Sequence, residues 1–232
     1  LVALQFALLI ALAICAGVVY RQREFAMRDA LRLNGDQVLL IYAPGPHGHA
    51  LADEVRKVPG VRSVSRSTVG FLGSCCFMQA VVIATRHTRN GDISFSKVGL
   101  DFDLFDFYGI KALAGHLPAA DGKSPRITEA DYVVLNETAA HKFGFGSPAQ
   151  ALGKFVPFSA QDAAPTPGKP ERSTVLAVVP DFSPTVEQAV PPTAYFQSGS
   201  GLDLISARLS GRDIPETLAA IDVLWHRLGN AD

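Results

Sequence analysis

The stretch Val134–Lys154, which reads VLNETAAHKFGFGSPAQALGK, decides between a phosphate-binding loop and a purely structural segment. A Walker A loop has four residues between its first glycine and a Gly-Lys pair, and Ser or Thr follows that pair. Here six residues separate Gly146 from Gly153. Lys154 is followed by Phe155, which offers no hydroxyl group to magnesium. The segment also leaves no room for the long helix that a phosphate loop opens, so this interpretation fails.

The same stretch predicts two short helices placed between two strands. Asn136 follows the apolar run 132–135 and can cap the free amides of a helix that starts at Glu137. Gly144 can end this helix by adopting a left-handed conformation. A capping-box pattern for a second helix is formed by three further residues, Ser147, Pro148 and Gln150. A strand-like run, 154–158, comes next, so the stretch specifies architecture.

The first twenty residues, LVALQFALLIALAICAGVVY, contain no charge and one strongly polar side chain, Gln5. Twenty helical residues span about 30 Å of hydrocarbon. The run is too long for a signal peptide and does not start with a basic leader. The other alternative is a buried core helix, which is disfavoured because the run lacks polar positions at helical spacing. Residues 1–20 are therefore predicted to form a transmembrane helix, followed by a charged helical stalk over 21–36.

Length and charge narrow the function classes. The 232 residues allow an anchor plus a domain of about 200 residues, which is enough for a buried core. Because the chain starts at Leu1 without a methionine, we expect it to be a segment of a longer protein. Lys and Arg total 21 and Asp and Glu total 22, giving a formal charge of -1. This balance lacks the basic field that nucleic-acid binding requires.

Residues 37–100 predict two strand units. The first is a strand-helix-strand unit. It consists of the apolar run QVLLIYA, then a set of apolar residues at helical spacing that ends at Pro59-Gly60, and then the alternating run VRSVSRSTV. Two longer strands, 76–87 and 93–100, flank the Asn90-Gly91 pair, which is typical of a hairpin turn. Cys75 and Cys76 are adjacent, and the Cα atoms of neighbours are closer than a disulfide normally requires. We expect them on opposite faces of a strand.

The rest of the chain predicts a proline-rich mobile loop, more strands and a closing helix. Residues 159–173 contain three prolines and little that can be buried. TVLAVVPDFS, TAYFQS and LDLISARLS read as strands. Asp213 and Glu216 suggest a capping box for the last helix. One apolar stripe follows along that helix, formed by Ile214, Leu218, Ile221, Trp225 and Leu228.

Three aspartates raise the question of a calcium site. Asp101, Asp103 and Asp106 have a suitable spacing, but a calcium loop also needs a central glycine and a bidentate glutamate near its twelfth position. Neither is present in this stretch. Phenylalanines alternate with the aspartates, so we expect a packed amphipathic turn whose carboxylates are exposed.

The histidines and serines do not form a recognisable active site. His47 and His49 resemble half of a metal site, yet no Cys, Asp or Glu at close ligand spacing completes it. His141 and His226 lie in predicted helices where surface or packing roles suffice. Ser74 follows a single glycine and lacks the flanking pattern of a nucleophile elbow. We therefore predict no catalytic, cofactor-binding or metal-binding residues.

The order of these elements resembles that of a known family. The relevant stretches are LQFALLIALAICAGVVYRQ, LNGDQVLLI, VPGVRSVSRS, FYGIKALAGH, VLNETAAHKFGFGSPAQALGK, VVPDFS and IPETLAAIDVLWHRL. In this order and spacing the chain resembles the MacB-like periplasmic core domain of FtsX-type ABC transporter permeases. The resemblance covers nearly the whole chain.

The resemblance implies an α+β fold with a transmembrane helix at 1–20, a stalk at 21–36 and a periplasmic domain at 37–232. The domain would have a strand-helix-strand layer and an inserted subdomain at about 111–172. The resemblance also implies that the domain is a non-catalytic component of a transporter. It would transmit motion that a cytoplasmic ABC ATPase drives, in order to export or extract a substrate. The other implied partners are a second permease half or copy, a periplasmic adaptor and the inner membrane.

Alternatives remain open for both the orientation in the membrane and the function. Arginines follow the apolar run at positions 21, 23, 28 and 32, and the positive-inside rule assigns such a flank to the cytoplasm. We give the resemblance precedence, because one flank samples that rule poorly. A membrane-anchored sensor or ligand-binding module would share the anchor and the domain but would need a concave apolar pocket. A membrane-anchored hydrolase would need an acid-base pair in a cleft, which the sequence does not display.

Overall fold

The computed structural model describes residues 2–25, 37–70, 79–83, 93–117, 132–156, 173–182, 190–198 and 201–228. Its helices are α1 (Val2–Phe25), α2 (Gly48–Val55), α3 (Asp103–Phe107), α4 (Glu137–Lys142), α5 (Pro148–Ala151) and α6 (Ile214–Leu228). Its strands are β1 (Val38–Tyr42), β2 (Val61–Ser67), β3 (Gln79–Ile83), β4 (Ile93–Leu100), β5 (Ala114–Gly115), β6 (Tyr132–Asn136), β7 (Phe155–Val156), β8 (Ser173–Val179), β9 (Thr193–Gln197) and β10 (Leu204–Leu209). The predicted mixed α/β domain behind an apolar N-terminal helix is confirmed, and its described strands form one mixed sheet.

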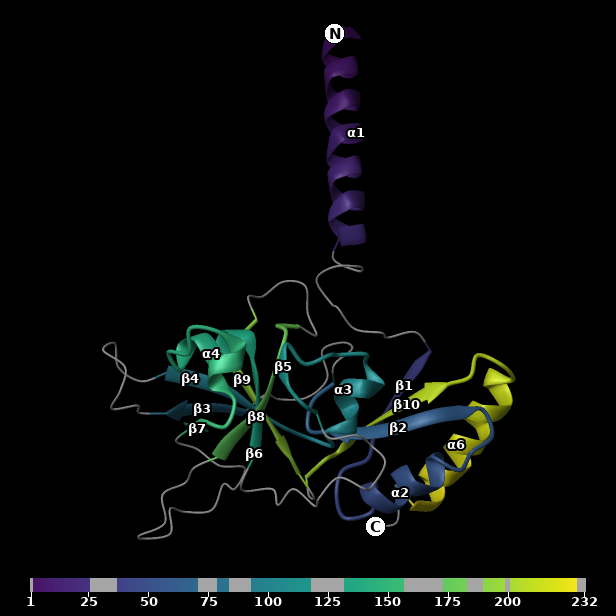
Figure 1. Cartoon of the computed structure of the whole chain (residues 1–232). Coiled ribbons are helices and arrows are strands. Elements are labelled where there is room, and N and C mark those ends of the chain that lie inside the picture. Colours follow the sequence, from purple (N-terminus) through teal and green to yellow (C-terminus); the bar gives the residue numbers. More distant parts are fainter. Residues whose placement is uncertain are drawn as a thin grey trace.

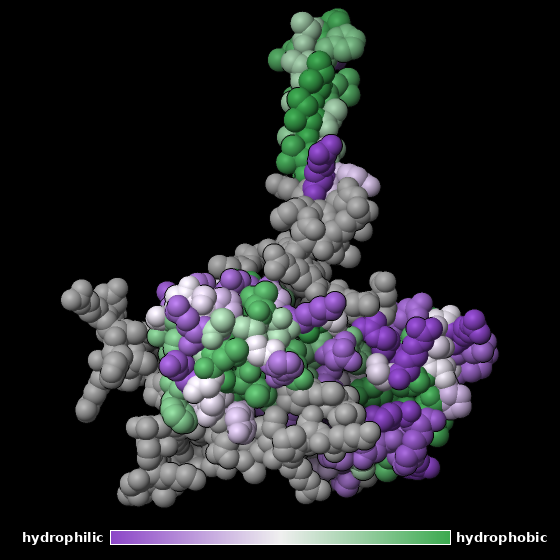
Figure 2. Space-filling model, in the orientation of Figure 1, coloured by the Kyte–Doolittle hydropathy of each residue, from purple (hydrophilic) through white to green (hydrophobic). Residues whose placement is uncertain are grey.

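Helix α1 stands apart from the rest of the chain (Figure 1). Apolar side chains cover it (Figure 2), and its span Val2–Arg21 is long and apolar enough to cross a membrane, with no part buried inside the structure. The helix ends at Phe25, so it continues from the apolar run into the first five residues of the stretch predicted as a helical stalk. Arginine does not interrupt a helix, because its side chain loses little freedom there.

All the strands that the structure describes belong to one sheet, with the order β1-β10-β2-β4-β9-β6-β8-β5, to which β3 adds beside β4 and β7 beside β8. The predicted strand-helix-strand unit is β1-α2-β2, but its two strands are not neighbours. β10 lies between them and runs antiparallel to both. The last strand of the domain therefore completes the sheet that the first two begin.

We call β1, β10 and β2 with helices α2 and α6 the smaller layer. Both helices lie on one face of these strands (Figure 1). Leu51 and Val55 of α2, Ile221 of α6 and Ile205 of β10 meet there in one buried apolar cluster. A stripe of apolar residues on each helix can be removed from water only against such a face, which explains why both helices pack here.

We call β3 to β9 with α3, α4 and α5 the larger half. Its central strands are buried on both faces: in β6, Val133 and Leu135 join a cluster beneath α4 and α5, while Val134 joins the cluster around α3. Successive side chains of a strand point to opposite faces. The apolar run 132–135, which has no polar alternation, is thus explained by a strand covered on both sides.

Several local predictions are confirmed. Asn136 is the N-cap of α4, and its side chain accepts a hydrogen bond of 2.9 Å from the amide of Ala139. Gly144 follows the helix with a φ of 86°. Gly153 has a φ of 69°, and its amide donates to the carbonyl of Val175, which joins the end of α5 to β8.

The two predicted capping boxes are wrong in detail. Ser147 precedes α5 but makes no side-chain capping bond, and the Gln150 side chain accepts from the amide of Gly146 instead. Asp213 precedes α6 with a φ of 50°, whereas a capping residue normally has an extended backbone. Its carbonyl accepts from the amide and the hydroxyl of Thr217. A sequence pattern fixes which groups are near one another, while the loop path decides which of them meet.

Some predictions fall outside the described residues. These are the Asn90-Gly91 turn, Cys75, Cys76 and Ser74, and the proline-rich segment up to residue 172. Of the strand predicted at 76–87, residues 79–83 are described, and they pair with β4 in an antiparallel register from Gln79↔Lys97 to Ile83↔Ile93. The division into an inserted subdomain at about 111–172 stays a prediction.

Candidate functional site

The smaller layer and the larger half meet where β2 passes β4, and we call this contact the seam. β2 pairs with β10 over six residues, but with β4 over one, Ser67↔Leu100. Two backbone hydrogen bonds flank that pair: the amide of Thr68 donates to the carbonyl of Gly99, and the amide of Asp101 donates to the carbonyl of Arg66. The sheet is continuous at the seam, but only by a short ladder.

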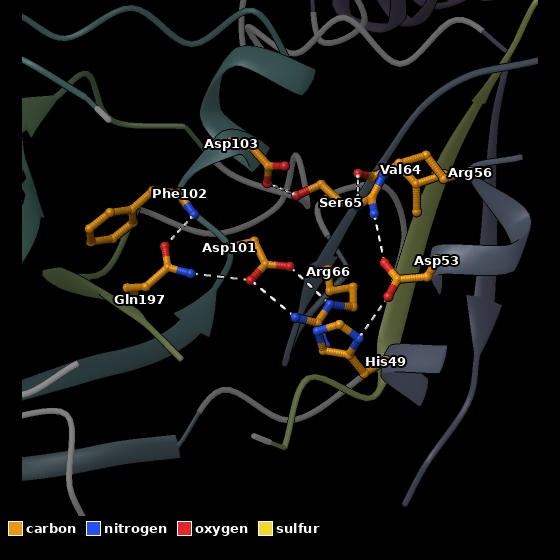
Figure 3. A network of polar contacts seen from close by, with 10 residues as sticks. All are labelled: His49, Asp53, Arg56, Val64, Ser65, Arg66, Asp101, Phe102, Asp103 and Gln197. Atoms are coloured by element: carbon orange, nitrogen blue, oxygen red, sulfur yellow. Dashed lines mark hydrogen bonds and ion pairs between the residues drawn. The ribbon is translucent and has the colours of Figure 1, made fainter. Parts of the chain in front are cut away.

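On the side of the sheet that faces α2, charged and amide side chains tie the seam together (Figure 3). Arg66 donates to both carboxylate oxygens of Asp101, at 2.9 and 3.3 Å. Gln197 of β9 donates to Asp101 at 3.2 Å and accepts from the amide of Phe102 at 2.8 Å. Arg66 is buried and Asp101 is largely so, with side-chain exposures of 10% and 18%. Such a shielded, forked arginine–carboxylate contact is stronger than an exposed ion pair.

On the opposite side of the sheet, α3 meets the smaller layer through polar groups. The hydroxyl of Ser65 donates to the carboxylate of Asp103. The hydroxyls of Tyr108 and Ser206 lie 3.1 Å apart, and both residues are buried. The guanidinium of Arg208 donates to the carbonyl of Phe107 at 2.6 Å. Serines on the strand face where α3 packs therefore replace the apolar side chains that the other face presents to α2 and α6.

Burial affects the ionisable groups in this contact. It raises the pKa of Asp103 above its usual range, and the nearby Asp101 carboxylate adds to that effect. The hydrogen bond from Ser65 and the positive charges of Arg56 and Arg66 act in the opposite direction without cancelling it. Burial also raises the pKa of Tyr108, so its hydroxyl stays neutral when it bonds to Ser206. The contact thus combines one partly desolvated carboxylate, neutral hydroxyls and the guanidinium of Arg208.

The prediction that three aspartates are exposed is wrong for two of them. Asp106 is exposed, but Asp101 and Asp103 are partly buried and bonded to β2. The alternation of aspartate and phenylalanine does reflect a packed turn, since Phe105 and Phe107 belong to the buried cluster around α3. The two carboxylates turn towards the seam because their partners come from strands that are distant in sequence.

The histidines selected from the sequence lie apart from the seam or at its margin. His49 on α2 contacts Asp53 at 3.1 Å, and Asp53 also pairs with Arg56 at 2.8 Å (Figure 3). His141 is exposed at the end of α4, and His226 lies 3.7 Å from Asp222 on α6. Within the described ranges, no group of three His, Cys, Asp or Glu side chains that could hold a metal ion is found.

Solved structures share this architecture. The periplasmic region of MacB from Actinobacillus actinomycetemcomitans matches with a TM-score of 0.56 and 17% identity, covering 85% of this chain and 86% of that one. The chain has a MacB-like periplasmic-domain fold. A domain of a candidate permease protein from Porphyromonas gingivalis matches with a TM-score of 0.53 and 16% identity, over 86% of this chain and 87% of that one.

A third match to the MacB-like fold is the extracellular domain of the noncanonic ABC-type transporter YknZ from Gram-positive bacteria. It has a TM-score of 0.53 and 18% identity, and covers 82% of this chain and 94% of that one. No protein-family model matches the sequence, and no curated protein matches it either. The likeness is therefore one of fold, because sequence identities of 16 to 18% do not by themselves show a relationship.

Within the MacB-like fold, two stretches that carried the resemblance come together. Asn136, in VLNETAA, accepts from the amide of Thr193 and donates to the carbonyl of Pro191, besides capping α4. Asp181, in VVPDFS, accepts from the amide and the hydroxyl of Thr138 in the first turn of α4. Asn136 is fully buried, so these motifs fasten α4 to the ends of two strands.

Sequence reasoning missed the seam. Arg66 and Gln197 were read as ordinary strand residues, and they lie 35 and 96 positions from Asp101. A weak signal was available, because a long charged side chain in the strand 61–69 is unusual unless a partner satisfies it. The sequence alone gave no means to identify that partner.

Proposed function

We propose that this chain is the periplasmic domain of an ABC transporter permease together with one membrane-crossing helix. The observation that carries the proposal is a MacB-like fold preceded by α1, whose apolar span is long enough for a bilayer. In this arrangement α1 anchors the chain in the inner membrane and the domain lies in the periplasm. Residues 21–36 form the stalk between the two.

In this proposal the domain performs no chemistry and transmits motion. A separate cytoplasmic ATPase supplies the work, a second permease half or copy completes the membrane part, and a periplasmic adaptor is a further partner. Residues 111–172 form the inserted subdomain. The mechanical role is supported by buried apolar clusters around α3, around α4 and α5, and beneath α2 and α6. Closely packed cores transmit displacement with little compression.

The side of the membrane is tested with single cysteines at Lys57 and Lys142, which are both exposed, in a chain whose three native cysteines are replaced by serine. A membrane-impermeant maleimide should label both positions in intact spheroplasts as fully as in lysed ones. Labelling that requires lysis would place the domain in the cytoplasm and contradict the proposal.

The partner is tested by purifying the full-length protein with its neighbouring gene products. We expect an ATPase with a Walker A loop to co-purify, and its ATP hydrolysis to drive substrate movement across a proteoliposome membrane. Saturable binding of a small molecule without any ATPase would instead support a membrane-anchored sensor.

A further inference from the structure

The smaller layer and the larger half are packed as separate bodies. The apolar cluster of the smaller layer is built from β1, β2, β10, α2 and α6 and the turns next to them. The two clusters of the larger half come mainly from its own elements. Among the described residues, two from the smaller layer's side join them: Val69, just past β2, is buried, and Val38 of β1 is partly buried. Within these clusters, two described apolar side chains of the smaller layer's side therefore bridge the two bodies.

The chain passes between these two bodies twice. It leaves the smaller layer after β2 and returns after β9, before β10 begins at Leu204. Both crossings lie at the same place in the sheet, because β2 pairs with β4 at Ser67↔Leu100 and β4 pairs with β9 at Leu100↔Gln197. The strand residues after which the chain leaves each body, Ser67 and Gln197, therefore flank the same residue of β4.

The contacts that hold the bodies together are chiefly polar. They include the Arg66–Asp101–Gln197 contacts on one side. On the other side they include the bonds of Asp103 and Tyr108 to β2 and β10 and the bond from Arg208 to Phe107. Water can replace a hydrogen-bond partner, so the net cost of opening such a contact is small compared with that of exposing a core. The seam is the place where the domain can yield while both bodies stay folded.

We propose that the seam is a hinge: when the two bodies tilt apart, the short ladder around Ser67 and Leu100 separates, and Arg66, Asp101 and Gln197 form the latch that holds it closed. This motion belongs to the domain itself and goes beyond the proposed function. Its use in transport rests on that function.

A disulfide lock tests the hinge without disturbing the latch. A Cβ atom added to Gly99 would lie 3.0 Å from Cγ2 of Thr68, which places a Thr68→Cys, Gly99→Cys pair within the reach of a disulfide. The full chain in detergent micelles carries this pair with Cys15, Cys75 and Cys76 replaced by serine. The readout is hydrogen exchange at the amide of Asp101, which donates across the seam to Arg66.

If the hinge opens, oxidising the pair should slow exchange at Asp101 by about tenfold or more. The control amides are Ala43, bonded to Asp203 within the smaller layer, and Val175, bonded to Lys154 within the larger half. At both control amides, the exchange rate in the oxidised protein should stay within about twofold of the rate in the reduced protein. An unchanged exchange rate at the Asp101 amide would show that the seam does not open separately and would overturn the proposal. Equal slowing at all three amides would do the same.

A latch variant gives the opposite change. Arg66→Met should speed exchange at Thr68 and Asp101 by about tenfold or more, because Asp101 loses its charged partner. Asp101→Asn, which keeps the side-chain shape, should do so to a smaller degree and serves if Arg66→Met does not fold. The matched control is Arg62→Met, since that exposed arginine bonds to Ser210 within the smaller layer. Equal acceleration by the control, or at Ala43 and Val175, would overturn the proposal.

The same lock separates this inference from the proposed function. In the assembled transporter, oxidation should stop substrate movement while reduction restores it. If the exchange results hold but the protein moves no substrate in either state, the hinge stands and the proposed function fails. If transport continues in the fully oxidised protein, the hinge has no role in it.

Discussion

β2 has a different kind of contact with each of its two neighbouring strands. With β10 it shares six paired residues and a buried apolar cluster beneath α2 and α6. With β4 it shares one pair and a set of hydrogen-bonded polar side chains. The comparison teaches that a sheet can be continuous in its strand order and still consist of two separately packed bodies, because cohesion comes from shared cores as well as from backbone ladders.

The largest effect is expected from breaking the core on the β10 side. Leu51 of α2 is fully buried, so Leu51→Ala should lower the free energy of unfolding by about 2 to 5 kcal/mol. Trp225 of α6 is the single tryptophan and reports on the smaller layer during urea unfolding. The control Leu113→Ala removes a side chain that is 49% exposed and should cost less than about 1.5 kcal/mol. Equal losses would contradict the comparison.

The second-largest loss of stability is expected from a substitution in the larger half. Asn136→Ala removes a cap and leaves buried backbone groups at Thr193 and Pro191 without their partner, at a cost of about 2 to 4 kcal/mol. Exchange at the Val175 amide should accelerate much more than at Ala43, which lies in the smaller layer. Gln150→Ala, which removes an exposed bond to Gly146, is the control. Equal acceleration at both amides would mean that the two bodies unfold together.

A smaller effect is expected at the outer edge of the smaller layer. The indole of Trp225 donates to the carbonyl of Tyr42 at 3.3 Å, which occupies one backbone acceptor of the edge strand β1. Trp225→Phe keeps most of the packing and should cost about 0.5 to 1.5 kcal/mol in thermal unfolding followed by circular dichroism. His226→Ala, beside it on α6 and exposed, should change the midpoint less.

The smallest effect concerns the pH dependence of the seam. Because the pKa of Asp103 is raised in the folded protein, folding favours its protonated form. Its contribution is most favourable below the unfolded pKa, near the ordinary value of 3.8, and declines as pH rises through the higher folded value. The stability of wild type relative to Asp103→Asn should therefore fall with rising pH over that window and then level off. The measurement is urea unfolding of both proteins from pH 3 to pH 8. A difference in unfolding free energy between them that does not change with pH would contradict this prediction.

Much of the fold could be predicted from local patterns. The apolar run at the N-terminus, the Asn136 cap and the strand-helix-strand unit each depend on residues that are close in sequence, and each is found in the structure. The capping boxes failed at Ser147 and Asp213 because those side chains respond to the path of the surrounding loop. The seam could not be predicted at all, since Arg66, Asp101 and Gln197 meet only after three strands have aligned.

The sequence by itself determined the helix that can cross a membrane, the positions of most strands and the faces that must be buried, because hydrophobic periodicity and capping act over a few residues. Only the tertiary structure decided that β10 enters between β1 and β2, and that the contact between β2 and β4 is short and polar. Both depend on pairings between segments far apart in the chain, whose closure local propensity does not encode.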